Sequence, residues 1–292
     1  MTTLTPVPRV GIVFRPQLPP ERLAGFVAAA EAAGLDDLWL WEDCFLEGGL
    51  TSAAAALAGS SSLRVGLGLM PVPLHHPALA AMEIATLARL FPGRFVPAFG
   101  HGVQAWMSQV GAGAASPMGL LREWLTAVAA LLRGETVTAA GSYVRLDRVA
   151  LDWPPAAPVP VLIGGRGPRT LALAGELADG LVLAAPTAPD TVRAAVARAA
   201  ATRPHDIVVY LPCGAGPGSA ERLAAELPAD APPGAELTAT GSPAEVAGTI
   251  RAFAAAGATT VVLQPAGDDP DVAATIRLAG AARAELRGGG RA

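Results

Sequence analysis

The chain has 292 residues, of which 52% are hydrophobic and 16% are charged, and its formal net charge is −4. This length and apolar content suffice for a large buried core and exclude an intrinsically disordered protein. No apolar run reaches the roughly 18 residues that span a bilayer, and the first residues lack the layout of a signal peptide. We therefore expect a cytoplasmic protein. Because the arginines are scattered, we expect a small-molecule partner and no nucleic acid.

The spacing of cysteines and histidines argues against a disulfide or a metal site. The two cysteines, Cys44 and Cys213, lie far apart in the sequence. The adjacent His75 and His76 would point to opposite sides of an extended segment, and no carboxylate follows them at metal-ligand spacing. We therefore expect neither kind of site.

Eight short apolar runs rich in Val, Leu and Ile recur along the chain, each followed by a turn and a segment with helical spacing. The runs show little alternation, which is typical of strands buried on both faces of a helix-covered parallel sheet. Eight strand and helix pairs in this length match a (β/α)8 TIM barrel, whose usual size is about 250 residues. The expected strands are residues 9–14, 37–41, 64–70, 94–99, 159–164, 180–184, 207–211 and 259–264.

One segment interrupts this repeat. Residues 134–158, between the fourth helix and the fifth strand, contain "YVRLDRVALDWPP" and indicate an insertion. Before the eighth strand, Ser242 and Glu245 have the spacing of a helix cap and first turn. We therefore expect a single α/β domain, residues 1–292, built as a TIM barrel with an insertion between helix 4 and strand 5.

Polar residues follow the second and fourth expected strands, at the carboxyl ends where TIM barrels place their active sites. The stretch "WLWEDCF" brings Glu42, Asp43 and Cys44 to that end of the barrel, and "GHGV" brings His101 there between two glycines. Two alternatives stay open: Asp43 caps the following turn, and Cys44 packs as a small apolar side chain.

The other three histidines are weaker candidates. His75 and His76 follow the third strand, but either is equally a residue that precedes a helix begun by Pro77. His205 precedes the seventh strand and falls at the opposite end of the barrel.

A glycine-rich turn follows the fifth expected strand. In "IGGRGPRTLALAG" the turn leads into a helix opened by Pro168, and its backbone amides and Arg166 indicate an anion site. The sequence lacks a Walker motif, a Gly-x-Gly-x-x-Gly turn after the first strand and a Gly-x-Ser-x-Gly elbow. These absences disfavour nucleotide hydrolysis, a Rossmann NAD site and a serine hydrolase.

The ordered set of motifs resembles the luciferase-like flavin and deazaflavin oxidoreductases. Within them it is similar to the coenzyme F420-dependent branch related to methylenetetrahydromethanopterin reductase. The resemblance covers most of the chain from the first strand to the eighth. It is carried by "AEAAGLDDLWLWED", "LRVGLGLMPVPLHHPALAAMEIATLARLFPGRFVPAFGHGVQAW", "PVLIGGRGPRTLALAGELADGLVL" and "TGSPAEVAGTIRAFAAAGATTVVL".

The resemblance implies F420, or alternatively FMN, bound at the barrel mouth. The ring would lie on a bulge that ends the third strand, where the family often has a non-proline cis peptide; here that bond joins Gly68 to Leu69. Asp43 matches an acidic position near the ring. The other implied cofactor contacts are Met70, Gly100, His101, Gly102, Val103, Gly164, Gly165, Arg166 and Gly167.

Two departures from the family bear on the reaction. The family's sugar phosphate and alcohol dehydrogenases carry a catalytic histidine where this chain has Cys44, and the sugar phosphate enzymes have a glutamate at Val103. We therefore expect a different reaction, hydride transfer to an electron-poor C=N or C=C bond. The candidates for its chemistry are Glu42 or His101 as proton donor, with Cys44 in the pocket beside Trp106 and Met107.

Other interpretations stay open at this point. One is an FMN-dependent monooxygenase, and another is a barrel that binds a flavin without turning it over. A Schiff-base aldolase is disfavoured because the sequence supplies no strand-end lysine. The resemblance also implies a homodimer formed through helices near the second and third strands, where "GGLTSAAAALAGSS" supplies small residues; the same residues can equally pack on their own barrel.

Overall fold

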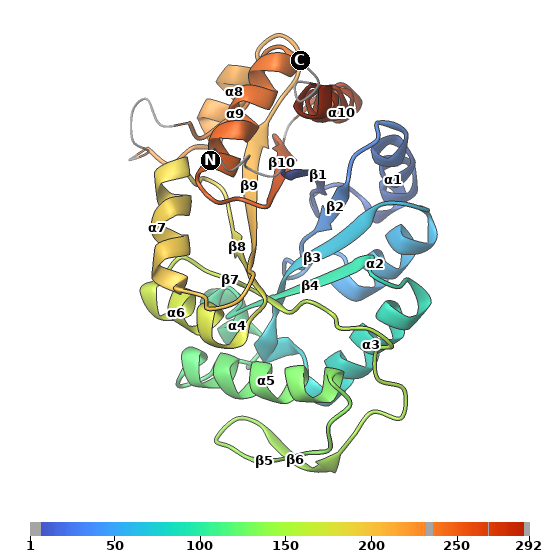
Figure 1. Ribbon diagram of the computed structural model, residues 1–292, viewed down its shortest axis with the longest axis vertical. Helices are drawn as coiled ribbons and strands as arrows, with labels where there is room; N and C mark the ends of the chain where they lie inside the picture. Colours follow the sequence, from blue (N-terminus) through green and yellow to red (C-terminus); the bar gives the residue numbers. More distant parts are fainter. Residues whose placement is uncertain (1–6, 230, 232–235, 268, 289–292) are drawn as a thin grey trace, which may run out of the picture.

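The computed structural model describes residues 7–229, 231, 236–267 and 269–288. Eight parallel strands close into a barrel in the order β1, β10, β9, β8, β7, β4, β3, β2, and helices surround it (Figure 1). The predicted TIM barrel is thereby confirmed. Its strands are β1 Arg9–Phe14, β2 Asp37–Leu40, β3 Arg64–Pro71, β4 Phe95–Gly100, β7 Leu162–Gly164, β8 Gly180–Leu183, β9 Asp206–Cys213 and β10 Thr260–Pro265.

The helices follow the strands as the sequence indicates, and Ser242 and Glu245 form the expected capping box at the start of α9. The α-helices are α1 Leu23–Ala32, α2 Gly49–Ala58, α3 Pro77–Leu90, α4 Gln104–Gln109, α5 Pro117–Leu132, α6 Pro168–Leu177, α7 Pro189–Ala199, α8 Ser219–Glu226, α9 Pro243–Ala255 and α10 Val272–Gly288. Two short 3-10 helices are η1 Pro20–Arg22 and η2 Val72–Leu74.

The inside of the barrel is filled by side chains, as is usual for this fold. Alternation along each strand sends one residue inward and the next outward. On β2, Trp39 is fully buried in the inner cluster, while Leu38 and Leu40 pack in the outer cluster against the helices. A Cβ atom at Gly66 would lie 2.3 Å from the Trp39 ring, so only glycine leaves room for that indole. The packed interior supports the cavity above it.

The third strand is irregular near its carboxyl end. Its pairing with β4 shifts register between Leu67 and Met70, and the peptide bond from Gly68 to Leu69 is cis. The predicted bulge and cis peptide are thereby confirmed. A second non-proline cis peptide joins Cys44 to Phe45 in the loop after β2.

The predicted insertion contains an antiparallel hairpin, β5 Val137–Ala140 and β6 Arg145–Val149. It projects beside α5 at the lower edge of the molecule (Figure 1). Glu123 on α5 accepts hydrogen bonds from the backbone amides of Tyr143 and Val144, at 2.8 and 2.9 Å, and so fastens the hairpin to the barrel.

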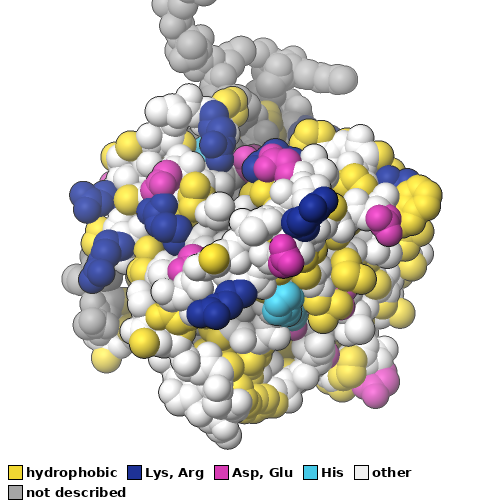
Figure 2. Space-filling view, turned by 90° about the horizontal axis from the view of Figure 1, so that it is seen from below, with side chains coloured by type: hydrophobic (Ala, Val, Ile, Leu, Met, Phe, Trp, Pro, Cys, Tyr) yellow, Lys and Arg dark blue, Asp and Glu magenta, His cyan; other side chains and the backbone are white. Residues whose placement is uncertain are grey.

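Charged side chains of both signs are interspersed on the face seen from below in Figure 2. This face has no continuous basic surface of the kind that binds nucleic acid. Among the described residues, no helix is long and apolar enough to cross a membrane.

Candidate functional site

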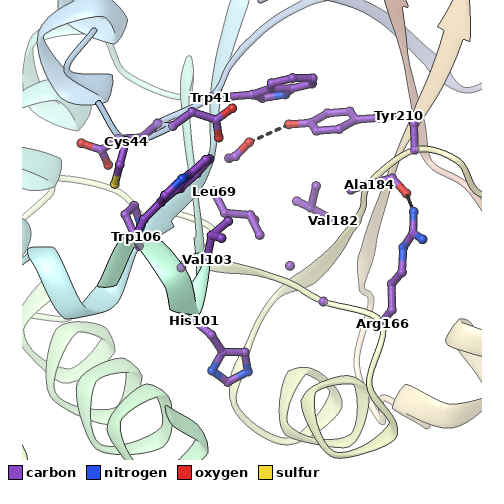
Figure 3. Close-up of a pocket in the computed structure, with 18 of the residues that line it drawn as sticks. Trp41, Cys44, Leu69, His101, Val103, Trp106, Arg166, Val182, Ala184 and Tyr210 are labelled. Atoms are coloured by element: carbon purple, nitrogen blue, oxygen red, sulfur yellow. Dashed lines mark hydrogen bonds between the residues drawn. The ribbon is translucent and has the colours of Figure 1, made fainter. Parts of the chain in front are cut away.

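A cavity of about 440 Å³ opens at the carboxyl ends of the barrel strands, and Figure 3 shows its walls. Twelve of the residues predicted for the site line it, and they come from the ends of β2, β3, β4 and β7 and from the loops and the helix α4 that follow them. These are Glu42, Asp43, Cys44, Gly68, Leu69, His101, Gly102, Val103, Trp106, Gly164, Gly165 and Arg166.

Leu69 lies at the floor of the cavity, where the bulge of β3 turns its side chain toward β4 and β7. A Cβ atom at Gly164 would lie 2.3 Å from Leu69 Cδ1, and one at Gly100 would lie 2.8 Å from the same atom. These two glycines therefore make room for the leucine. The bulge gives the cavity an apolar floor.

Aromatic side chains from three elements form further walls (Figure 3). The rings of Trp41 and Tyr210 lie 5.8 Å apart, and Trp106 approaches from α4. The Tyr210 hydroxyl donates a hydrogen bond to the Gly68 carbonyl at 3.1 Å and so ties β9 to the bulge. Burial raises the pKa of Tyr210 far above its usual value, and the phenol stays protonated.

Two acids, Glu42 and Asp43, follow β2 and lie at one end of the cavity. Oε2 of Glu42 is 2.8 Å from Nε2 of His75, a histidine that does not itself line the cavity. Burial raises the pKa of Asp43, and the opposing charge of Arg15 reduces this effect. Desolvation therefore makes Asp43 easier to protonate than an exposed aspartate.

Cys44 is half-buried beside these acids. Burial raises the pKa of its thiol first, and the negative charges of Glu42 and Asp43 raise it further. The thiolate is the reactive form of cysteine. Cys44 is therefore a neutral thiol near pH 7 and contributes shape and polarity to the cavity, without acting as a base.

His101 reaches the cavity edge, but its ring is turned toward the neighbouring helices α5 and α6 (Figure 3). Nε2 lies 3.1 Å from the Thr170 hydroxyl, and Nδ1 lies 3.3 Å from the Pro117 carbonyl. Burial lowers the pKa of the imidazole, partly offset by the contact with Pro117. Both ring nitrogens thus have protein partners, which favours a positioning contact over proton donation.

The glycine-rich turn lies opposite the acids, at the amino end of α6. The cap residue Gly167 has no side chain to bond the first amides of this ten-residue helix, so they remain available to an anion. Arg166 donates to the carbonyl oxygens of Ala184 and Pro186. The cavity thus carries acids at one end and a cationic, amide-rich turn at the other.

Three predicted cofactor contacts do not line the cavity. Met70 is fully buried, because the residue after the bulge turns into the core between barrel and helices. Gly100 is covered by Leu69, so its freedom serves packing and not approach to a ring. Gly167 caps α6 outside the cavity, and its contact with an anionic tail stays a prediction. Met107, expected in the pocket, is 1% exposed. The burial of Met70 and Met107 and the cover of Gly100 by Leu69 correct the prediction.

Sequence reasoning missed several lining residues because it considered mainly the loops after the strands. Tyr210 lies in β9 and Gln264 in β10, at inward-facing positions near the carboxyl ends of these strands. Val208 and Val262 face the inside of the barrel, and side chains two residues further along each strand face the same way. This alternation would have found both residues. The missed residues are Trp41, Pro71, Val182, Ala184, Ala185, Tyr210 and Gln264.

Comparison with known proteins defines the class to which this barrel belongs. The family model for luciferase-like monooxygenases matches residues 7–226, and the chain belongs to that family. Over 190 residues it is 34% identical to an F420-dependent glucose-6-phosphate dehydrogenase of Nakamurella multipartita, covering 59% of this chain and 55% of that one. Over 174 residues it is 29% identical to a 5,10-methylenetetrahydromethanopterin reductase of Methanolobus tindarius, covering 59% and 53%. The chain spans little more than half the length of these two relatives.

Solved structures confirm the fold over nearly the whole chain. An F420-dependent secondary alcohol dehydrogenase, in complex with an F420-acetone adduct, superposes with a TM-score of 0.82 at 20% identity, covering 94% of this chain and 99% of that one. The coenzyme F420-dependent tetrahydromethanopterin reductase from Methanopyrus kandleri gives 0.78 at 21% identity, covering 94% and 97%.

Proposed function

We propose that this protein is an oxidoreductase that uses coenzyme F420 to reduce a small organic substrate at an electron-poor C=N or C=C bond. The observation that carries the proposal is the cavity itself, in which an apolar bulge lies between an acidic end and an amide-rich anion site. The F420 dependence named for the Nakamurella multipartita relative and the reductase activity named for the Methanolobus tindarius relative agree with it.

The residues present fit such a cofactor. The volume of about 440 Å³ lies within the usual range of ligand sites, roughly 300–1,000 Å³. Leu69 and Val182 offer apolar contact to a flat ring, while the turn at Gly164–Arg166 and the start of α6 suit its anionic tail. When bound and reduced, F420 supplies a hydride.

The chain's own residues hold and protonate the substrate. Glu42 lines the cavity and gives a proton to the atom beside the carbon that accepts the hydride. Cys44 and Trp106 shape the space for the substrate, and Trp41 and Tyr210 limit the access of water from the barrel side. His101 stabilises the loop after β4 through Thr170.

The charge of the cavity argues against phosphorylated substrates. The sequence has no lysine, and Arg166, the cation among the lining residues, is engaged by two backbone carbonyls at the cofactor end. A sugar phosphate would bring its charge toward Glu42 and Asp43. We therefore expect that this protein does not oxidise glucose 6-phosphate, the substrate in the name of the Nakamurella multipartita relative.

Fluorescence quenching with F420 and with FMN tests the cofactor. We expect quenching by F420. Cyclic imines or enones should then oxidise reduced F420, which is seen as a gain in the absorbance of the oxidised deazaflavin. Glucose 6-phosphate should not bleach oxidised F420. Preferential binding of FMN with consumption of oxygen would instead identify a monooxygenase. Tight binding of F420 without turnover across the panel would indicate a binding protein. If Glu42→Gln and His101→Ala both kept full turnover, the proton donor would have to be another group.

We also propose that the protein forms a homodimer. Ala53, Ala56 and Leu57 of α2 are fully buried on their own barrel, so these residues do not contribute to the contact surface. The outward face of α3 is apolar instead, with Leu79 and Met82 half-exposed or more. An exposed apolar stripe on a helix is typical of a protein interface.

A further inference from the structure

Glu42 has a partner that sequence reasoning did not assign to it. Nε2 of His75 lies 2.8 Å from Oε2 of Glu42, and the two side chains are 15% and 16% exposed. Glu42 lines the cavity, while His75 lies behind it at the end of η2, the short helix that follows β3. The pair therefore links the cavity to the protein surface.

The backbone fixes both members of the pair. Oε1 of Glu42 accepts a hydrogen bond from the Gly49 amide at 3.4 Å, at the start of α2. The carbonyl of His75 accepts one from Trp124 Nε1 at 2.6 Å. Trp124 is 1% exposed and packs on Phe99 of β4 with the ring centroids 4.7 Å apart. His75 is thus anchored to the barrel core and holds its ring against Glu42.

The charges around Glu42 explain why such a partner matters. In its own loop, the charges of Glu42 and Asp43 both act on the Cys44 thiol, and the charge of Asp43 also acts on Glu47. Arg15, which follows β1, acts on Asp43. Burial, and then the neighbouring acids, raise the pKa of Cys44. In the described part of the chain, His75 is the one basic side chain that pairs with Glu42.

We propose that His75 is a positioning residue that orients the Glu42 carboxyl group and returns a proton to it after each turnover. The proposal rests on the proposed function. The Glu42 carboxyl gives its proton to the substrate atom beside the carbon that received the hydride, and becomes a carboxylate. His75 Nε2 then donates a proton to Oε2, and the imidazole regains one from water at its exposed edge. Each cycle consumes one hydride and one proton.

Kinetics of His75→Gln test this role, with 3,4-dihydroisoquinoline as the imine probe and 2-cyclohexen-1-one as the enone probe. We expect kcat to fall about tenfold or more, because a misplaced general acid loses part of its usual contribution, while KM changes little. The pH profile of kcat should change as well. Imidazole added to His75→Ala should restore part of the rate, which a purely structural role would not allow.

His76 provides the matched control. It is the next residue, it is exposed, and its ring accepts a hydrogen bond from the Ala78 amide as the cap of α3. Asparagine is a good cap residue, so His76→Asn should keep the wild-type rate and pH profile. Thermal unfolding of each variant checks that the fold is retained.

The outcomes separate this inference from the function on which it rests. Wild-type kcat and pH profile in His75→Gln would overturn it, as would an absence of rescue by imidazole. If F420 did not bind at all, the proposed function would fail. Nitrogen NMR of the histidines would still show whether His75 interacts with Glu42. A His75 Nε2 resonance that moves in Glu42→Gln supports the positioning role, and one that stays unchanged rules it out.

Discussion

The side chain of Leu69 fills the space that Cβ atoms at Gly100 and Gly164 would need. The sequence indicated these glycines as contacts of a cofactor, because a glycine after a strand often permits close approach of a ligand. The structure gives their more immediate task, which is to accommodate the bulge. That task depends on a register shift in β3, which strand periodicity does not reveal.

Replacing Gly164 by alanine should therefore destabilise the protein. The new methyl group would meet Leu69 Cδ1 at 2.3 Å, and overpacking of this kind costs about 1–3 kcal/mol. Leu69→Ala in the same chain removes the clash, so the double variant should lose less stability than the two single effects added together. Urea unfolding of the wild type, the two single variants and the double variant gives the free energies of unfolding for this double-mutant cycle.

Gly248 is the control for this cycle. It lies within α9 and has open space around its missing side chain, so Gly248→Ala should be neutral or stabilising. Equal stability of Gly164→Ala and the wild type would show that the bulge moves aside without cost.

Cys44 and Cys213 should differ in reactivity toward iodoacetamide. Cys213 is fully buried, and burial raises its pKa to about 12, whereas Cys44 is partly exposed. One thiol should react, slowly at pH 8. Glu42→Gln removes a charge that raises the pKa of Cys44, and should speed the reaction about threefold or more.

Mass spectrometry after digestion identifies the labelled thiol. Cys213→Ser should still be labelled, and Cys44→Ala should not. An unchanged rate in Glu42→Gln would mean that the charge of Glu42 does not reach the thiol.

At the scale of elements, the sequence predicted the regular parts of the fold and missed the irregular ones. The apolar runs located every barrel strand, because burial on both faces leaves a continuous apolar signature. Helix α4 was not separated from α5, since six residues are too few for a clear helical period. The partnership of Glu42 with His75 was missed as well, because it joins two loops that only the closed barrel brings together.

Glu31 provides a test of how two elements are joined. From the last turn of α1 it accepts hydrogen bonds from the backbone amides of Ser61 and Ser62, both at 2.7 Å, in the turn before β3. The amide of Ser62 has the largest part in lowering the pKa of Glu31 from 4.5 to about 2, and burial opposes the shift. A lowered acid pKa stabilises the fold above pH 4.5, and the contribution is lost as pH falls toward 2.

Glu31→Gln should therefore lower the free energy of unfolding by about 1–2 kcal/mol at pH 7, the value being reduced because the group is exposed. The difference from wild type should shrink in urea unfolding as the pH falls from 4.5 toward 2, the window set by the two pKa values. Glu21→Gln is the control, because Glu21 is exposed and forms no side-chain hydrogen bond with the described residues. A difference that is constant with pH would contradict the assignment.

At the scale of the whole molecule, the two ends of the barrel are built differently. At the amino ends of the strands, Asp37 pairs with Arg9 and Arg64, and Asp36 pairs with Arg283 of α10. These charges satisfy one another and close the barrel. At the carboxyl ends, the acids and the glycine turn face the cavity, which leaves their polar groups available to ligands. Chain order alone predicted which end would carry the site, because a closed parallel barrel places all strand ends of one kind together.

The proposed homodimer would cover apolar side chains that a single barrel leaves exposed. Leu79, Met82 and Leu90 are 50%, 55% and 65% exposed on one helix, and Trp153 beside α3 is 72% exposed. A stable dimer buries about 800 Å² on each subunit, and these side chains offer an apolar centre for such a contact. Light scattering after size exclusion should therefore give twice the mass of the 29.4 kDa chain.

Leu79→Glu combined with Met82→Glu should convert this dimer to a monomer, because two carboxylates on each copy would be buried without partners. Val7→Glu is the control, since Val7 is 54% exposed near the opposite end of the barrel, before β1. The double variant should still bind F420, because the residues that line the cavity come from one chain and none of them lies on α3. A wild-type protein that runs as a monomer at micromolar concentration would contradict the dimer, and a double variant that stays dimeric would place the contact on another face.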